Sequence, residues 1–152
     1  MPDRIAVIHA RWHTQIVDQG CHSLLESLGS LGVCRDRVDR FSVPGSDEIP
    51  LCAQRLAAIG RYAAIVAVGL VVNGGIYRHD FVADAVISGL MRVQLDSGVP
   101  VVSMVPTPHH FHGHDAHEAF YFEHFKIKGA EAAAVCVAVM AEPCPEPATS
   151  VA

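Results

Sequence analysis

The fold is decided by residues 62–82, which read Tyr-Ala-Ala-Ile-Val-Ala-Val-Gly-Leu-Val-Val-Asn-Gly-Gly-Ile-Tyr-Arg-His-Asp-Phe-Val. The first part, Tyr62–Val72, is the most apolar run of the chain, which is typical of a strand buried on both faces in a parallel sheet. Gly74 and Gly75 then predict a tight turn, and a helical pattern begins at about Asp80. A buried strand, a glycine turn and a helix in this order predict the phosphate-cradling end of an open α/β sheet.

Strand and helix patterns alternate along the rest of the chain, as shown by apolar runs and by apolar spacings of three and four. Before the central strand we expect a strand over Ile5–Ala10, a helix from an N-cap at Thr14 to about Leu31, an edge strand over Arg37–Val43 and a helix from Ser46 to about Ile59. After it we expect a helix ending at Asp96, a strand over Val99–Val105, a loop over Pro106–His114, a helical aromatic piece over His117–Phe125 and a separate helix over Gly129–Met140.

This alternation predicts an α/β fold with a four-stranded parallel sheet, helices on both faces and right-handed crossovers. We expect a single domain over residues 1–142. The segment Pro143-Cys-Pro-Glu-Pro147 cannot continue a helix, so we expect residues 143–152 to be a disordered tail. In such a sheet the functional site lies beyond the carboxyl ends of the strands.

Composition argues against several classes of protein. The formal net charge of −5 argues against a nucleic-acid surface. No apolar run reaches the ~20 residues of a membrane span, and the N-terminus lacks the basic region of a secretory signal, so we expect no membrane partner and a cytoplasmic location. The five cysteines are odd in number and form no C-x-x-C pair, which predicts reduced thiols. Hydrophobic residues make up 51% and charged residues 18%, which favours a homo-oligomer that covers apolar surface.

The glycine turn is the first candidate site. The backbone amides of Gly75 and Ile76 stand at a helix start and suit an anion, although a Gly-Gly pair alone more often marks a plain strand-to-helix turn. Arg78 and His79 follow as one fixed cation and one titratable imidazole.

Two further candidates lie at the ends of earlier strands. Ser46, Asp47 and Glu48 open a helix and could hold a polyol or uracil-like ligand, or could serve only as an ordinary helix cap. Trp12 could stack on a planar heterocycle or could seal the edge of the core.

Five histidines crowd between His109 and His117, and imidazole is the commonest metal ligand. The spacing matches no familiar zinc pattern, and nearby carboxylates are limited to Asp115 and Glu118. We therefore expect no metal site and keep a histidine-rich metal-binding protein as an alternative.

Taken together, these segments resemble the 6,7-dimethyl-8-ribityllumazine synthase family over about Arg4 to Met140. The matching motifs are Val43-Pro-Gly-Ser-Asp-Glu-Ile-Pro50, the segment 68–82, the segment 89–101 and Lys126-Ile-Lys-Gly-Ala-Glu-Ala-Ala133. The Gly-Gly-Ile-Tyr-Arg-His-Asp-Phe and Thr-Pro-His-His-Phe-His versions are similar to the type II subgroup.

The resemblance implies a flavodoxin-like sandwich with strand order 2-1-3-4. It also implies the condensation of 5-amino-6-(D-ribitylamino)uracil with 3,4-dihydroxy-2-butanone 4-phosphate, in which phosphate is released and no cofactor or metal is used. Members of the family form pentamers with sites shared between subunits, and type II members form dimers of pentamers.

The resemblance also implies roles for individual residues. Trp12 stacks on the pyrimidine, and Ser103 stands where an aromatic residue of the neighbouring subunit closes the pocket. The ribityl chain is bound by Ser46, Asp47 and Glu48, the ring is lined by the backbone of Leu70, Val71 and Val72, and the phosphate is bound by Gly75, Ile76 and His117.

The chain departs from the family pattern at the proton-transfer position. The family's acid/base histidine aligns with Arg78, and the imidazole stands one place later at His79. Arginine cannot be deprotonated near neutral pH, so Arg78 is suited to charge stabilisation and not to base catalysis. Proton transfer is left to His79, to water or to the substrate phosphate. A non-catalytic flavin or lumazine carrier on the same scaffold is the alternative function.

Overall fold

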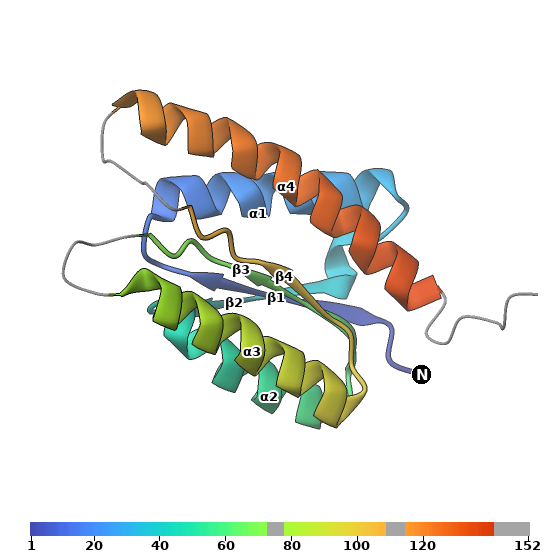
Figure 1. Cartoon of the computed structure of the whole chain (residues 1–152). Helices are drawn as coiled ribbons and strands as arrows, with labels where there is room; N and C mark the ends of the chain where they lie inside the picture. The colour runs from blue at the N-terminus through green and yellow to red at the C-terminus, as the bar shows by residue number, and fades with distance from the viewer. Residues whose placement is uncertain (73–77, 109–114, 142–152) are drawn as a thin grey trace, which may run out of the picture.

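The computed structural model describes residues 1–72, 78–108 and 115–141, with side chains described from Glu118 onward in the last range. They form three layers, with α1 and α4 on one face of a parallel sheet and α2 and α3 on the other (Figure 1). The predicted tail at 143–152 lies outside the described residues. No helix within the described ranges combines the length and apolar character of a membrane span.

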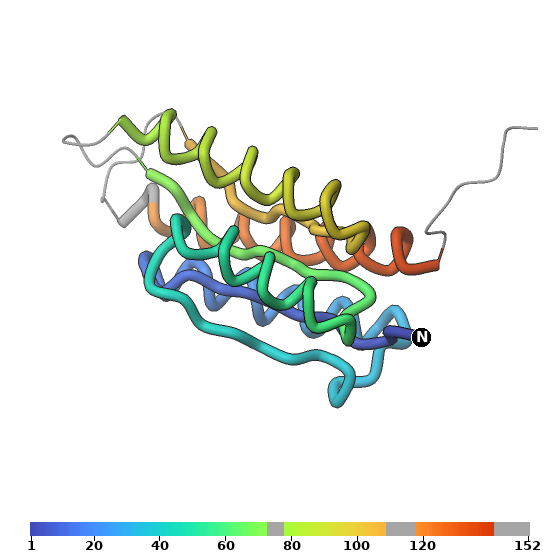
Figure 2. The backbone as a smooth tube through the Cα atoms, turned by 90° about the horizontal axis from the view of Figure 1, so that it is seen from below, coloured from blue at the N-terminus to red at the C-terminus, as the bar shows by residue number. Residues whose placement is uncertain are grey.

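The strands lie in the order β2-β1-β3-β4 and all pair in parallel, which confirms the predicted topology and the edge position of β2. The carboxyl ends of the strands gather at one end of the molecule, opposite the N-terminus, and α2 and α3 cross the sheet side by side (Figure 2). The elements are β1 Arg4–Ala10, α1 Thr14–Ser30, η1 Arg35–Arg37, β2 Val38–Val43, η2 Ser46–Glu48, α2 Ile49–Ile59, β3 Tyr62–Val68, α3 His79–Ser97, β4 Val101–Met104 and α4 Asp115–Ala141.

Two predicted strands are longer than the observed ones. Regular strand β3 ends at Val68 and not at Val72, and β4 spans four residues. The chain nevertheless continues beside its neighbour, because the Gly69 amide donates to the Met104 carbonyl (3.1 Å) and the Val71 amide donates to the Pro106 carbonyl (3.2 Å). The backbone at the end of β3 is therefore held in place without a regular ladder.

The two predicted C-terminal helices are one helix, α4. Gly129 does not end a helix but lets α4 approach α1. A Cβ at Gly129 would lie 2.7 Å from the Gly20 carbonyl oxygen, so the two backbones meet with no side chain between them. Beside this crossing the Ser23 hydroxyl donates to the Lys126 carbonyl. Close packing on α1 therefore overrides the helix-ending preference of glycine.

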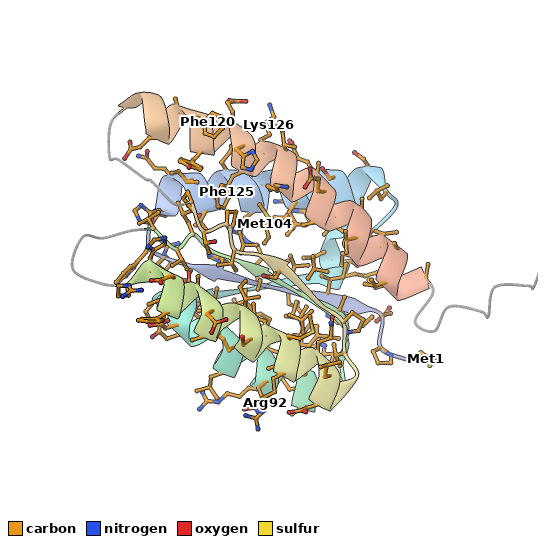
Figure 3. All side chains as sticks on the ribbon, in the orientation of Figure 1. Met1, Arg92, Met104, Phe120, Phe125 and Lys126 are labelled. Atoms are coloured by element: carbon orange, nitrogen blue, oxygen red, sulfur yellow. The ribbon has the colours of Figure 1, made fainter. Side chains whose placement is uncertain are left out.

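The hydrophobic core has two parts, one on each face of the sheet. In β1, Ile5 and Val7 belong to the part beneath α1 and α4, while Ala6 and Ile8 belong to the part beneath α2 and α3. All four are fully buried, as a parallel sheet covered on both faces requires. Figure 3 shows Phe125 of α4, also fully buried, in the first of these layers.

A polar network ties the amino ends of three strands. Arg4 donates from Nε to Asp39 Oδ2 (2.8 Å), and the Tyr62 hydroxyl donates to the same oxygen (3.0 Å). The Arg4 guanidinium, aided by Tyr62, lowers the pKa of Asp39 to about 2. The network lies at the opposite end of the sheet from the candidate site, so its role is in stability.

Candidate functional site

Three of the predicted site segments meet at the carboxyl ends of β1, β2 and β3. The Arg11 amide donates to the Val43 carbonyl (3.0 Å), which holds the chain after β1 against the chain after β2. Ser46 lies against Gly69, where a Cβ would be 2.7 Å from the Ser46 hydroxyl oxygen. The structure therefore brings these predicted segments together.

Trp12 lies at this meeting point and is 69% exposed, which argues against the alternative that it seals the core. A Cβ built on Gly45 would lie 3.9 Å from Trp12 Cε2 and 4.0 Å from Cδ2. The indole therefore lies against the backbone of the turn after β2, and most of its surface is accessible to a planar ligand.

The turn after β2 is closed by Glu48. Its Oε2 accepts a hydrogen bond from the Gly45 amide at 2.8 Å, while the side chain stays exposed. Ser46 is 9% exposed and Asp47 is exposed. A carboxylate has about four acceptor positions, so Glu48 can close the turn and still accept from ligand hydroxyls.

The chain after β3 buries two of its side chains in the core. Leu70 packs into the core beneath α1 and α4, and Val71 packs into the core beneath α2 and α3. Val72 is half-buried. This burial supports the prediction that these residues line a ligand through main-chain atoms. Gly75 and Ile76 lie outside the described residues.

Arg78 and His79 stand at the start of α3. The Arg78 guanidinium binds Asp80 through Nε–Oδ1 (3.2 Å) and Nη2–Oδ2 (3.0 Å), and its Cζ lies 4.5 Å from the centre of the Phe81 ring. The hydrogen bond from Arg78 also lowers the pKa of Asp80. Arg78 is therefore a positioned cation, and His79, the first residue of α3, is half-buried.

Ser103 lies away from this group, in a groove of about 370 Å³ between α3, β4 and α4. It is exposed and pairs in register with Ala67, within the strand and not at its end. Lys128 and Glu131, paired at 2.7 Å, line the same groove. His117 belongs to the first turn of α4, and its side chain lies outside the described residues.

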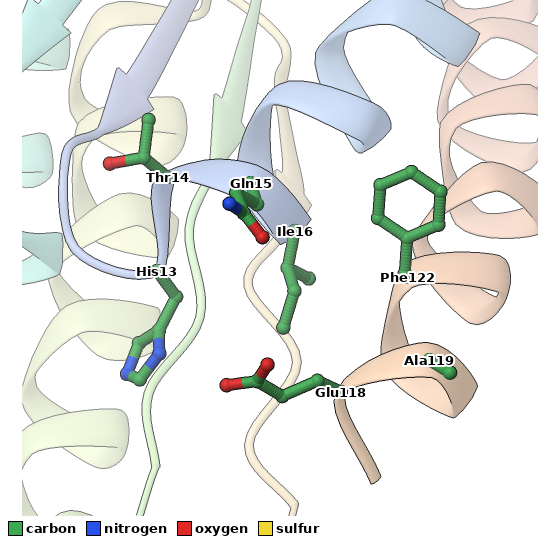
Figure 4. Close-up of a pocket in the computed structure, with 7 residues that line it drawn as sticks. All are labelled: His13, Thr14, Gln15, Ile16, Glu118, Ala119 and Phe122. Atoms are coloured by element: carbon green, nitrogen blue, oxygen red, sulfur yellow. The ribbon is translucent and has the colours of Figure 1, made fainter. Parts of the chain in front are cut away.

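His13 was not predicted as a site residue, and it lines a pocket of about 580 Å³ between the starts of α1 and α4 (Figure 4). It has φ 55° and ψ 47°, which among the described residues is the one left-handed conformation of a residue other than glycine. His13, and not Thr14, is the N-cap of α1, because its carbonyl accepts the first helical hydrogen bond, from the Val17 amide (3.0 Å). The Thr14 hydroxyl donates back to the Arg11 carbonyl. The available sequence signal was its position directly after Trp12 at a strand end.

A metal site finds no support among residues 1–72, 78–108 and 118–141, whose side chains form no group of three or more potential ligands. The predicted cluster falls largely elsewhere, since His109 to His114 lie outside the described residues.

Comparison with known proteins agrees with the geometry. Residues 3–143 match the family model of 6,7-dimethyl-8-ribityllumazine synthase. A protein of that name from Rhodococcus erythropolis is 62% identical over 86% of this chain and 84% of its own length. A 6,7-dimethyl-8-ribityllumazine synthase 2 from Pseudomonas syringae pv. tomato is 52% identical over 88% and 79%, and one from Bradyrhizobium diazoefficiens is 50% identical over 89% and 81%. The name "synthase 2" fits the predicted type II subgroup. By match and by site geometry, the chain belongs to the 6,7-dimethyl-8-ribityllumazine synthase family.

Proposed function

We propose that this chain condenses 5-amino-6-(D-ribitylamino)uracil with 3,4-dihydroxy-2-butanone 4-phosphate, giving 6,7-dimethyl-8-ribityllumazine and phosphate. The observation that carries the proposal is the contact of the exposed Trp12 indole with the Gly45 turn, in a chain that belongs to this family. The reaction needs no metal or organic cofactor, because the substrate amine is itself the nucleophile.

The enzyme acts mainly by orientation. Trp12 stacks on the pyrimidine, and the backbone after β3 lines the ring edge at Leu70, Val71 and Val72. Ser46, Asp47 and Glu48 bind the ribityl hydroxyls beside the ring. Holding the two substrates in a near-attack geometry removes translational and rotational freedom before the chemistry starts, which is the largest contribution such a site can make.

The phosphate leaves at the start of α3. Backbone amides of Gly75 and Ile76 bind it, and the guanidinium of Arg78 stabilises its charge. Arg78 keeps its proton, so it does not act as a base. His79 is the neighbouring imidazole and is a proton carrier in this proposal.

The family forms homo-oligomeric assemblies. For this chain we propose pentamers, paired as a dimer of pentamers in the cytoplasm, in which Ser103 and His117 contribute to the site of the neighbouring subunit. Two observations support this arrangement: Ser103 lies in a groove whose lining does not include Trp12, and α3, which lines that groove through Ile87, also exposes Met91 and Leu95 (50% and 74%). Such apolar surface is typical of a subunit contact.

The two-substrate assay tests the proposal, with product followed by the absorbance of the lumazine ring. We expect turnover by the wild type, a severe loss in Arg78→Ala because the charge stabilisation is lost, and a smaller loss in His79→Ala because a proton carrier is lost. Near-normal turnover in His79→Ala would assign the function of this position to Arg78 alone. Riboflavin binding without any condensation would favour the alternative, a flavin or lumazine carrier. Light scattering of the same sample should give the mass of ten chains.

A further inference from the structure

His13 adopts a backbone conformation that is sterically unfavourable for a residue with a Cβ. Its φ of 55° and ψ of 47° lie in the left-handed region, where glycine would meet no such penalty. Non-glycine residues in this region are concentrated at functional sites, where the side chain has a use that outweighs the strain. The strained backbone at His13 therefore indicates that its imidazole has a functional role.

The imidazole is half-buried and lines the pocket between the starts of α1 and α4. Figure 4 shows its ring and the carboxylate of Glu118 pointing into the same space. Among the described side chains, Glu118 of α4 is the charged group that faces it. His13 also follows Trp12 directly in the chain after β1, so it stands at the same carboxyl end of the sheet as the residue that stacks on the pyrimidine in the proposed function.

We propose that His13 is a second catalytic imidazole of this site, with Glu118 as the residue that positions it. The inference rests on the proposed function and adds a residue to it. Arg78 cannot accept a proton, so an imidazole at this end of the sheet fills a role that the glycine turn leaves open.

His13 acts when the two substrates join. The 5-amino nitrogen forms a bond to the ketone carbon, and the carbonyl π bond opens onto its oxygen. The neutral imidazole takes the proton from the nitrogen, which has become an ammonium, and passes it to the oxygen, which becomes a hydroxyl. The imidazole is neutral again at the end of the step, so no other reactant is consumed.

The electrostatics fit this role. Burial lowers the pKa of His13, and the Glu118 carboxylate opposes that shift. The imidazole is therefore neutral near pH 7 and able to accept a proton, while the carboxylate stabilises the imidazolium that forms for a moment.

The central test compares His13→Gly with wild type. Glycine keeps the left-handed backbone and removes the imidazole, so we expect a melting temperature that is equal or higher, together with a fall of about 10- to 100-fold in kcat. The acidic limb of the kcat/KM pH profile should disappear. His13→Asn, which also tolerates this conformation, should lose the limb as well.

Glu118→Gln tests the positioning role. Loss of the negative charge lowers the pKa of His13 further, so the acidic limb should move to lower pH, and the NMR titration of the His13 ring should move with it. The exposed pair His22 and Glu26, 3.2 Å apart on α1, offers matched controls. His22→Ala and Glu26→Gln should leave the rate and the pH profile unchanged.

Two results would overturn the inference. One is a His13→Gly enzyme that keeps wild-type kcat and its acidic limb. The other is an acidic limb that His79→Ala abolishes while Glu118→Gln leaves it in place. A wild type that forms no lumazine would instead defeat the proposed function, and this inference with it.

Discussion

The guanidinium of Arg78 is held by the carboxylate of Asp80 through two hydrogen bonds, at 3.2 and 3.0 Å, at the first turn of α3. The pair is exposed, with 70% and 52% of the side chains accessible, so its value lies in geometry more than in stability. Asp80 therefore orients a cation that, in the proposed reaction, acts only through its charge.

The first prediction concerns the orientation of Arg78 by Asp80. Asp80→Asn should raise KM for the phosphate substrate because Arg78 is no longer oriented, and Arg78→Ala should raise it further, by roughly 10-fold or more. Thermal stability should stay unchanged in both. Asp96→Asn, which breaks the exposed Arg92–Asp96 pair on the same helix, is the control and should leave KM unaffected. Equal KM values in all four proteins would contradict the role of Asp80.

The second prediction concerns the contact of Gly69 with Ser46. A Cβ at Gly69 would lie 2.7 Å from the Ser46 hydroxyl oxygen and 3.3 Å from Ile49 Cδ1. Gly69→Ala should lower the free energy of unfolding by about 1–3 kcal/mol. It should also displace the turn that we propose binds the ribityl chain, and so raise KM for the uracil substrate.

Urea unfolding and steady-state kinetics measure both effects. Adding Ser46→Gly to Gly69→Ala should restore part of the stability, because the closer clash is removed. Gly29→Ala is the control, since nothing lies within 4 Å of a Cβ there and the helix should become more stable by about 0.5–1 kcal/mol. A Gly69→Ala protein as stable as wild type would refute the close approach.

The third prediction concerns His9, which is 6% exposed in β1 and whose Nδ1 finds no hydrogen-bond partner among the residues that the structure describes. Burial first, and then the charge of Arg40, lower its pKa. The unfolded chain therefore binds more protons than the folded chain below about pH 6.5, so the free energy of unfolding should fall as the pH drops through this range.

His9→Val should flatten this loss and raise stability at pH 7 by roughly 1 kcal/mol, because the unpaired buried nitrogen is gone. Denaturant unfolding between pH 7.5 and 5 measures both the free energy of unfolding and its slope with pH. The pKa of His13 is also lowered, so His13 contributes to the same loss of stability at low pH. In the double variant with His13→Gly, the free energy of unfolding should therefore depend still less on pH. A slope unchanged by His9→Val would show that other groups govern acid sensitivity.

The fourth prediction concerns Asp39, whose pKa lies near 2 because of Arg4 and Tyr62. A depressed carboxyl pKa stabilises the fold fully above the unfolded value of about 3.9, and the contribution is lost as the pH falls towards 2. Asp39→Asn should therefore be less stable than wild type at pH 7, and the two stabilities should converge between pH 4 and 2. Parallel curves over that range would exclude the ion pair as the cause.

The order of strands and helices was readable from the sequence because burial on both sides of the sheet leaves apolar runs such as Tyr62–Val68. Close approaches between elements that are distant in the sequence were not readable in this way. A separate helix was expected to begin at Gly129, although this residue lies inside α4 and lets that helix touch Gly20 in α1. Thr14 looked like a cap because its hydroxyl suits that position, and only the backbone geometry shows that it bonds to Arg11 instead.

The site was readable in part for a related reason. Residues at strand ends, such as Trp12 and Glu48, are placed by topology alone, so their meeting could be predicted. The left-handed backbone of His13 leaves no trace in composition or spacing. Ser103 lies away from Trp12 because β4 pairs with β3 in a register that sets Ser103 opposite Ala67. The sequence of a single segment does not encode that register.

Leu70 and Val71 bury their side chains in opposite halves of the core, so at these two positions the proposed ligand can be met only by the main chain. Main-chain atoms are the same whatever residue supplies them. Exchange of these two side chains therefore cannot change how the ring edge is recognised. New ring specificity in this scaffold has to arise elsewhere, at positions such as Trp12, His13 and Glu48, whose side chains can change without disturbing either half of the core.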